Sequence, residues 1–187
     1  AGTYSILLPG KEGFTSDGRY VVNPSYWVFH SLASLREIDP NPQWDELYES
    51  GLQLLNAIVG RYKAVPDWVA LSPEGELSEP EGFEWVTGYN ALRIPLYLRL
   101  AGEEANAVFL AFRKQWGETS ASFPVVRSLY DNSVLEESQD PGFLALRSLL
   151  SCDTSRAVPK LSEESLYYPA TLLLFTRLVW ARELSEC

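Results

Sequence analysis

The chain has 187 residues, which is the size of a single domain and enough to bury a hydrophobic core. Apolar residues make up 46% of it and aromatic residues 13%, a composition typical of globular rather than disordered proteins. The formal net charge of −10 argues against nucleic acid and acidic membrane surfaces as partners, because both require a basic patch, but it does not disfavour a neutral ligand such as a sugar.

Cysteine, histidine and apolar patterns exclude further classes. Cys152 and Cys187 lack a CxxC metal spacing, and the single histidine, His30, cannot form a histidine-rich metal site, so we expect neither a metal nor a cofactor. The sequence does not decide whether the two cysteines form a disulfide. No apolar run reaches the ~18 residues needed to span a bilayer, and we expect no signal peptide within this sequence. The chain begins at Ala1 and contains no Met, so we expect a processed product or part of a longer protein.

The first third of the chain combines a turn-rich segment with two helices. Residues 1–22 contain turn signals and short β-type runs. A helix is expected at 23–38, where Asn23 is placed to cap it and Pro24 takes the first helical position. Residues 41–64 repeat apolar side chains at steps of three and four, which predicts an amphipathic helix.

The remainder alternates loops with further helices. A short extended piece at 65–71 precedes an acidic loop or hairpin at 72–85, and 117–138 is expected to be mostly loop. Pro95 is expected to kink its helix. The expected helices cover residues 88–102, 103–116 (with acidic residues in its first turn), 140–151 and 162–184. This pattern predicts a mostly α fold of about six helices, either a bundle or one half of a larger helical toroid.

No common catalytic motif is present by itself. The stretch PGKEG lacks the glycine spacing and the Lys-Ser/Thr ending of a phosphate loop. A Ser–His–Asp triad would have to use His30, which we interpret as structural, and we interpret Cys152 as a core or disulfide residue. Several aromatic residues lie beside loops and helix starts, where they form either core or a carbohydrate cleft, and composition does not decide between the two. They are Tyr26, Trp27, Trp68, Trp85, Tyr89, Tyr167 and Tyr168.

Four stretches resemble glycoside hydrolase family 8, most of all the endoglucanases encoded with bacterial cellulose synthases. They are LLPGKEGFTSDGRYVVNPSYW (7–27), PDWV (66–69), GYNALRIPLYL (88–98) and YYPATLLLF (167–175). The resemblance implies an (α/α)6 barrel around a long cleft and an inverting hydrolase of β-1,4-glucan, secreted or periplasmic. Inversion requires a carboxylic acid and a carboxylate base about 6.5–9.5 Å apart, with water between them.

The resemblance also assigns roles to residues. Tyr89, Asn90 and Arg93 match the family segment whose aspartate is the general base in many members, and Tyr26 matches a tyrosine near the attacking water. Arg93 is one helical turn from Asn90, suited to holding its side chain or a substrate hydroxyl. The expected substrate-binding aromatics are Tyr89, Trp68, Trp85, Tyr167 and Tyr168.

Two departures from the family pattern matter. Asn90 is an amide that cannot take a proton near neutral pH, so it orients water at most, and Glu84 or another acid of 74–84 is the candidate base. Whether Asn90 is natural or engineered stays open. The family's Ser-Glu-Gly-x-x-Tyr segment, which carries the general acid, and its Asp-Ala-Asp segment are both absent.

Residues 1–187 are therefore expected to be the C-terminal half of a family 8 domain. Its exposed apolar faces would then be covered by a second chain, carrying the N-terminal half, or by a homodimer. The alternatives are a non-catalytic glucan-binding or partner-binding half-barrel and a plain helical interaction domain.

Overall fold

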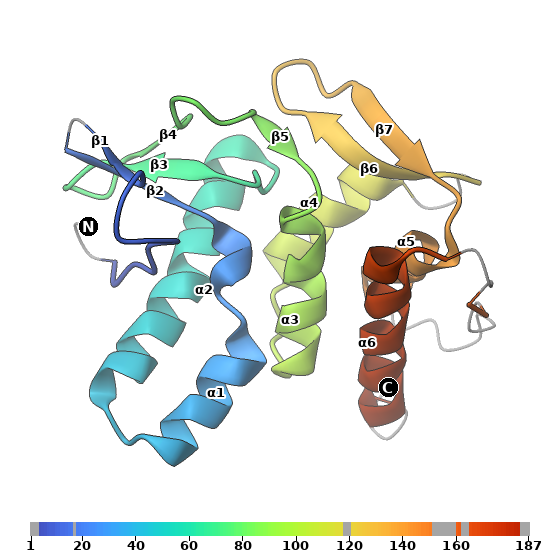
Figure 1. The fold of residues 1–187 in the computed structure, drawn as a ribbon, viewed down its shortest axis with the longest axis horizontal. Coiled ribbons are helices and arrows are strands. Elements are labelled where there is room, and N and C mark those ends of the chain that lie inside the picture. Colours follow the sequence, from blue (N-terminus) through green and yellow to red (C-terminus); the bar gives the residue numbers. More distant parts are fainter. Residues whose placement is uncertain (1–3, 17, 118–120, 151–159, 162–164, 184–187) are drawn as a thin grey trace.

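The computed structural model describes residues 4–16, 18–117, 121–150, 160–161 and 165–183. Helices make up its lower part in Figure 1, and two small sheets lie together at the upper end of those helices. Within the described residues the α-helices are α1 (Phe29–Ile38), α2 (Pro42–Tyr62), α3 (Ile94–Leu100), α4 (Asn106–Trp116), α5 (Pro141–Leu146) and α6 (Tyr167–Glu183). Short 3-10 turns occupy Pro24–Tyr26, Ala91–Arg93 and Arg147–Leu150.

Both sheets are antiparallel. The first contains β1 (Thr15–Ser16), β2 (Arg19–Val22), β3 (Val69–Leu71) and β4 (Leu77–Ser78) in that order. The second contains β5 (Val86–Thr87), β6 (Phe123–Ser128) and β7 (Val134–Ser138) in that order. Each sheet joins segments that are far apart in the sequence, and the chain passes from the first sheet to the second between β4 and β5 (Figure 1).

Helix α2 is the centre of the apolar core. Its Leu54, Leu55 and Ile58 are almost completely buried, as the expected three- and four-residue spacing requires. Gly51 lets Trp27 lie flat against the helix, because a Cβ at this position would be 2.1 Å from the indole Cδ1. The indole N–H of Trp27 donates a hydrogen bond of 2.9 Å to the carbonyl of Leu47, which satisfies its only polar group in the core.

Most expected helices are present, with ends that differ from the expectation. Asn23 does cap a helical turn, accepting a hydrogen bond from the Ser25 N–H at 3.0 Å, but that turn is a separate 3-10 segment before α1. Pro95 does not kink a helix: it lies in the first turn of α3, where proline lacks only an N–H that has no partner in the helix anyway. The acids Glu103 and Glu104 precede α4 instead of occupying its first turn.

The expectation that 117–138 is mostly loop was wrong, because this stretch contains the hairpin β6–β7. Phe123 and Val125 alternate with less buried neighbours and are fully buried, which is the two-residue period of a half-buried strand. Asn132 adopts a left-handed conformation, with φ of 63°, in the turn between the strands, and asparagine tolerates this conformation better than most residues. Pairing with the distant β5 completes the sheet.

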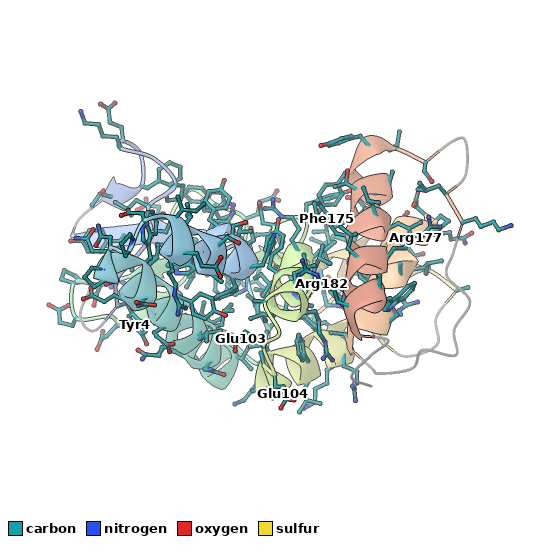
Figure 2. All side chains as sticks on the ribbon, turned by 90° about the horizontal axis from the view of Figure 1, so that it is seen from below. Tyr4, Glu103, Glu104, Phe175, Arg177 and Arg182 are labelled. Carbon is teal, nitrogen blue, oxygen red and sulfur yellow. The ribbon has the colours of Figure 1, made fainter. Side chains whose placement is uncertain are left out.

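Side chains from loops and helix ends connect the helices at their lower ends. Figure 2 shows Arg182 reaching from α6 toward α3, where its Nη1 donates to the carbonyl of Leu100 at 3.2 Å. Glu103, also labelled there, follows α3 and accepts a hydrogen bond from the Tyr48 hydroxyl on α2. None of the helices in the described part of the chain has the length and hydrophobicity needed to cross a membrane.

Candidate active site

A buried carboxylate, Asp67, organises the point where the two sheets approach the start of α3. Its side chain is 7% exposed, and it lies just before β3. One oxygen, Oδ1, accepts hydrogen bonds from the main-chain N–H groups of Gly88 at 2.8 Å and Ala91 at 2.9 Å. The other, Oδ2, accepts from the main-chain N–H of Asn90 at 3.3 Å and from its Nδ2 at 3.4 Å. The carboxylate therefore holds the turn that carries Asn90.

The electrostatic environment of Asp67 combines two opposing effects. Burial raises the pKa of its carboxyl group, because a charge is costly in a low-dielectric surrounding, while the hydrogen bonds from Ala91, Gly88 and Asn90 lower it. Burial is the largest contribution, and the net direction of the pKa is upward. Glycine suits position 88, because a Cβ there would make a tight contact of 3.0 Å with Oδ2 of Asp67.

Asn90 and Arg93 form a polar pair that continues from Asp67. The Nη2 of Arg93 donates to Oδ1 of Asn90 at 2.8 Å and to Oγ of Ser25 at 2.7 Å. Ser25 in turn donates to Oδ1 of the fully buried Asn23 at 2.7 Å. One network thus joins three separate segments of the chain: the 3-10 turn before α1, the segment before β3 and the start of α3. The expected pairing of Asn90 with Arg93 is present.

An aromatic group lies beside this network, and we call it the Trp68 cluster: Phe14, Tyr26, Trp68 and Phe83. Trp68 stacks on Phe14 with ring centroids 5.8 Å apart, lies 4.7 Å from Phe83 and contacts Tyr26 edge-on at 6.1 Å. Two dipeptides, Ser25-Tyr26 and Asp67-Trp68, each contribute one polar residue to the network and one aromatic residue to this cluster. Tyr26 is 37% exposed, so part of the cluster faces solvent.

A second aromatic group borders the network at the start of α6: Tyr89, Phe143 and Tyr168, here called the Tyr168 cluster. The Tyr168 hydroxyl donates to the carbonyl of Tyr89 at 2.5 Å, and their rings meet edge-on at 5.6 Å. Burial raises the pKa of Tyr168, although the positive charge of Arg93 nearby opposes this. Burial, and then a hydrogen bond from its hydroxyl to Glu136, raise the pKa of Tyr89 to about 12.

The structure does not bring every sequence candidate to this place. The ring of Trp85 is 8% exposed and packs edge-on against Tyr62, with centroids 5.0 Å apart, as part of the core. Tyr167 is 86% exposed at the first position of α6, with its ring outside the Tyr168 cluster. Glu84 is exposed, and within the described residues no acid of 74–84 has a hydrogen bond to Asn90 or Arg93. Cys152 and Cys187 lie outside the described residues.

Three contributors were missed by sequence reasoning: Asp67 as the carboxylate that holds the turn, and Phe14 and Phe83 as members of the Trp68 cluster. The only local signal for Asp67 was its place in PDWV directly before Trp68. Its partners lie 21 to 24 residues further along the chain, so no local pattern could identify them. No group of metal-binding side chains occurs in the part of the chain that the structure describes.

Comparison with known proteins identifies the family of the chain. The model of the family "Glycosyl hydrolases family 8" matches residues 1–181. A probable endoglucanase of Novacetimonas hansenii is 31% identical over 186 residues, which cover 98% of this chain and 54% of that protein. An endoglucanase of Cellulomonas uda is 28% identical over 147 residues, covering 77% of this chain and 40% of that protein. The chain spans about half the length of the curated relatives it matches.

Solved structures give the same result for the fold. The endo-β-1,4-glucanase CMCax from Acetobacter xylinum superposes with a TM-score of 0.88 and 31% identity, covering 98% of this chain and 59% of that one. A family 8 endo-β-1,4-glucanase from an Achatina fulica gut metagenomic library superposes with a TM-score of 0.83 and 26% identity, covering 96% and 57%. The expected mostly α class is confirmed. The chain belongs to glycosyl hydrolase family 8 and has the architecture of about half of that family's (α/α)6 barrel.

Proposed function

We propose that this chain is the C-terminal half of an inverting endo-β-1,4-glucanase that hydrolyses cellulose-type β-glucan. The single observation that carries the proposal is the network of Asp67, Asn90, Arg93 and Ser25, bordered on two sides by aromatic clusters, in a chain of family 8. Aromatic faces beside a polar floor suit a glucan, because pyranose rings stack on aromatic rings while polar groups bind their hydroxyls.

Each part of the site has a role in this proposal. Asn90 and Tyr26 hold the attacking water, and Arg93, with no carboxylate within 4.0 Å among the described residues, is available to a substrate hydroxyl. Tyr89, Trp68 and Tyr168 bind sugar rings. The general acid comes from an N-terminal half that carries the Ser-Glu-Gly-x-x-Tyr segment of the family.

The base in this proposal is a carboxylate other than Asn90, since an amide cannot accept the proton of the water. Glu84 is the candidate, supported by its position directly after Phe83 of the Trp68 cluster and by its exposure. Asp67 is not suited to the task, because four donors already occupy its two oxygens.

The test is hydrolysis of carboxymethyl cellulose by the complete domain, obtained by combining this chain with the N-terminal half. We expect new reducing ends, and we expect proton NMR to detect the α-anomer first, because inversion of a β-linkage produces it. Glu84→Gln should remove activity, and the matched change Glu81→Gln should not. Absence of activity in the complete domain and also in its Asn90→Asp variant would refute the proposal.

A non-catalytic glucan-binding or partner-binding protein is the second candidate, and the amide at the base position favours it. It predicts that cello-oligosaccharides bind without turnover and that Tyr26→Ala weakens this binding. Calorimetry measures oligosaccharide binding to the complete domain. Binding without detectable hydrolysis over days would select this candidate over the enzyme.

The proposal includes a partner surface and a location. Leu174 and Leu178, four residues apart on α6, are 55% and 47% exposed, although such leucines ordinarily pack against a neighbour. We assign the N-terminal half of the domain to this face, and a homodimer is the competing outcome. Light scattering of the chain with and without that half distinguishes them. A secreted or periplasmic location accords with a polymeric glucan substrate and is tested by fractionation of cells.

A further inference from the structure

The orientation of the Asn90 carboxamide follows from the charges on its two sides. Its Nδ2 lies 3.4 Å from Oδ2 of Asp67, and its Oδ1 lies 2.8 Å from Nη2 of Arg93. The reverse orientation would place the amide oxygen against a carboxylate and the amide N–H2 against a guanidinium, so both contacts would be repulsive. An anion on one side and a cation on the other therefore leave Asn90 a single favourable orientation.

Asp67 is itself held in one position. Both of its oxygens are engaged: Oδ1 by the N–H groups of Gly88 and Ala91, and Oδ2 by the main chain and the side chain of Asn90. The side chain is buried, and the main-chain N–H of Gly88 lies only 2.8 Å from Oδ1. A carboxylate with four donors and little solvent is a fixed acceptor, and whatever it binds is fixed with it.

We propose that Asp67 is a positioning residue of the water site, which orients the Asn90 side chain so that its oxygen faces Arg93 and its second Nδ2 hydrogen remains for the water. Asp67 does not touch the reacting atoms. It acts through Asn90, and this role rests on the proposed function. The position that holds a base in many family members thus offers the water an N–H donor in this chain, with a direction set by Asp67.

The test compares Asp67→Asn with a matched control, Asp140→Asn, in the protein that contains the whole family 8 domain. Asp140 caps α5, where it accepts a hydrogen bond from the Gly142 N–H at 2.8 Å, and asparagine retains that cap. At position 67 the substitution is not tolerated in the same way. The amide nitrogen of the new asparagine at position 67 would face two donors, the main-chain N–H and the Nδ2 of Asn90. The Asn90 side chain must therefore rotate away.

Two readouts follow. The two hydrogens on Nδ2 of Asn90 exchange separately, and NMR should show the one that faces Asp67 exchanging at least tenfold more slowly than the side-chain amide of the exposed Asn132. This protection should disappear in Asp67→Asn and persist in Asp140→Asn. Hydrolysis of cello-oligosaccharides should show kcat at least tenfold lower for Asp67→Asn, with KM changed less than twofold, whereas Asp140→Asn should leave both within twofold. A purely structural role of Asp67 would not separate kcat from KM in this way.

The exchanged pair Asp67→Asn with Asn90→Asp completes the test, since a donor then faces an acceptor again. Because Asn90→Asp also places a carboxylate at the base position, the double variant is compared with Asn90→Asp alone, and its kcat should be lower by a smaller factor than Asp67→Asn causes in the unsubstituted protein. Some loss remains because the main-chain N–H of residue 90, 3.3 Å from Oδ2 of Asp67, then meets a donor. In the unsubstituted protein, lack of protection of the Asn90 Nδ2 hydrogen that faces Asp67 would overturn the proposal even if Asp67→Asn does not fold. Protection that depends on Asp67, with no hydrolysis by any form, would refute the proposed function and support the orientation by Asp67.

Discussion

The substitution Asn90→Asp tests the electrostatic balance of the site. It replaces the amide nitrogen by an oxygen 3.4 Å from Oδ2 of Asp67, while the other oxygen remains 2.8 Å from Nη2 of Arg93. With an effective dielectric constant of about 20, the repulsion is about 5 kcal/mol and the attraction about 6 kcal/mol. These are upper bounds, and they nearly cancel. The hydrogen bond lost to Asp67 costs about 1 kcal/mol.

We therefore expect Asn90→Asp to change the free energy of unfolding by less than about 1.5 kcal/mol, as measured by urea denaturation at pH 7. The control is Asn56→Asp, since Asn56 is exposed on α2 and makes only a local hydrogen bond to the Leu52 carbonyl. Adding Arg93→Gln to Asn90→Asp removes the attraction and leaves the two carboxylates together. We expect the double variant to lose 2 kcal/mol or more beyond the sum of the two single changes, roughly the coupling of residues in direct contact.

Additive free energies in this double variant would refute the reasoning, since they would mean that Arg93 does not offset the charge at position 90. Destabilisation of Asn90→Asp alone by more than about 3 kcal/mol would refute it as well, because the two opposing Coulomb energies would then not cancel. If both expectations hold, the introduced carboxylate is stable and ionised at pH 7, beside a cation, in the position of the family's base.

Other changes test packing, substrate binding and pH dependence. Gly142→Ala should lower the free energy of unfolding by about 2–3 kcal/mol in urea, because its Cβ would lie 1.9 Å from the carbonyl oxygen of Pro169 and α5 would have to move from α6; an unchanged midpoint would contradict this packing. Trp68→Ala should weaken binding of cello-oligosaccharides to the complete domain about tenfold by calorimetry, a loss of about 1.4 kcal/mol, and unchanged affinity would exclude stacking there. Tyr89 has a pKa of about 12 when folded, above the ordinary 10, so its contribution to stability is complete below pH 10 and is lost as the pH rises toward 12. Tyr89→Phe should make the decline in stability over that range less steep, and an identical decline in both proteins would show that Tyr89 does not contribute.

The amphipathic pattern predicted the helices better than it predicted their ends. Helix α2 has the expected extent almost to the residue, because its apolar spacing and the Asn41 cap are both local. The expected helix at 23–38 divides into a 3-10 turn and α1, since Trp27 leaves the helical path to pack on Gly51. The hairpin β6–β7 was missed because its strands are short and are stabilised by pairing with β5. The first residue of β5, Val86, lies 37 residues before the first residue of β6, Phe123.

The candidate site was predictable to a similar degree. The family segments in the sequence pointed to Asn90, Arg93 and Tyr26, and the spacing of three residues placed the first two on one turn. The structure adds Asp67, whose charge determines how Asn90 is oriented, and it separates Trp68 from Trp85, two tryptophans that the sequence treated alike. Only the first belongs to an aromatic cluster beside the network.

By itself the sequence determined the mostly α class, the family and the identity of the amide at the base position, because these depend on local periodicity and on which residue types occur in which order. The tertiary structure alone decided which side of Asn90 faces a carboxylate and which faces a guanidinium. Hydrogen bonds act over about 3 Å, and the groups they join here come from segments up to 68 residues apart, so their geometry exists only once the chain has folded.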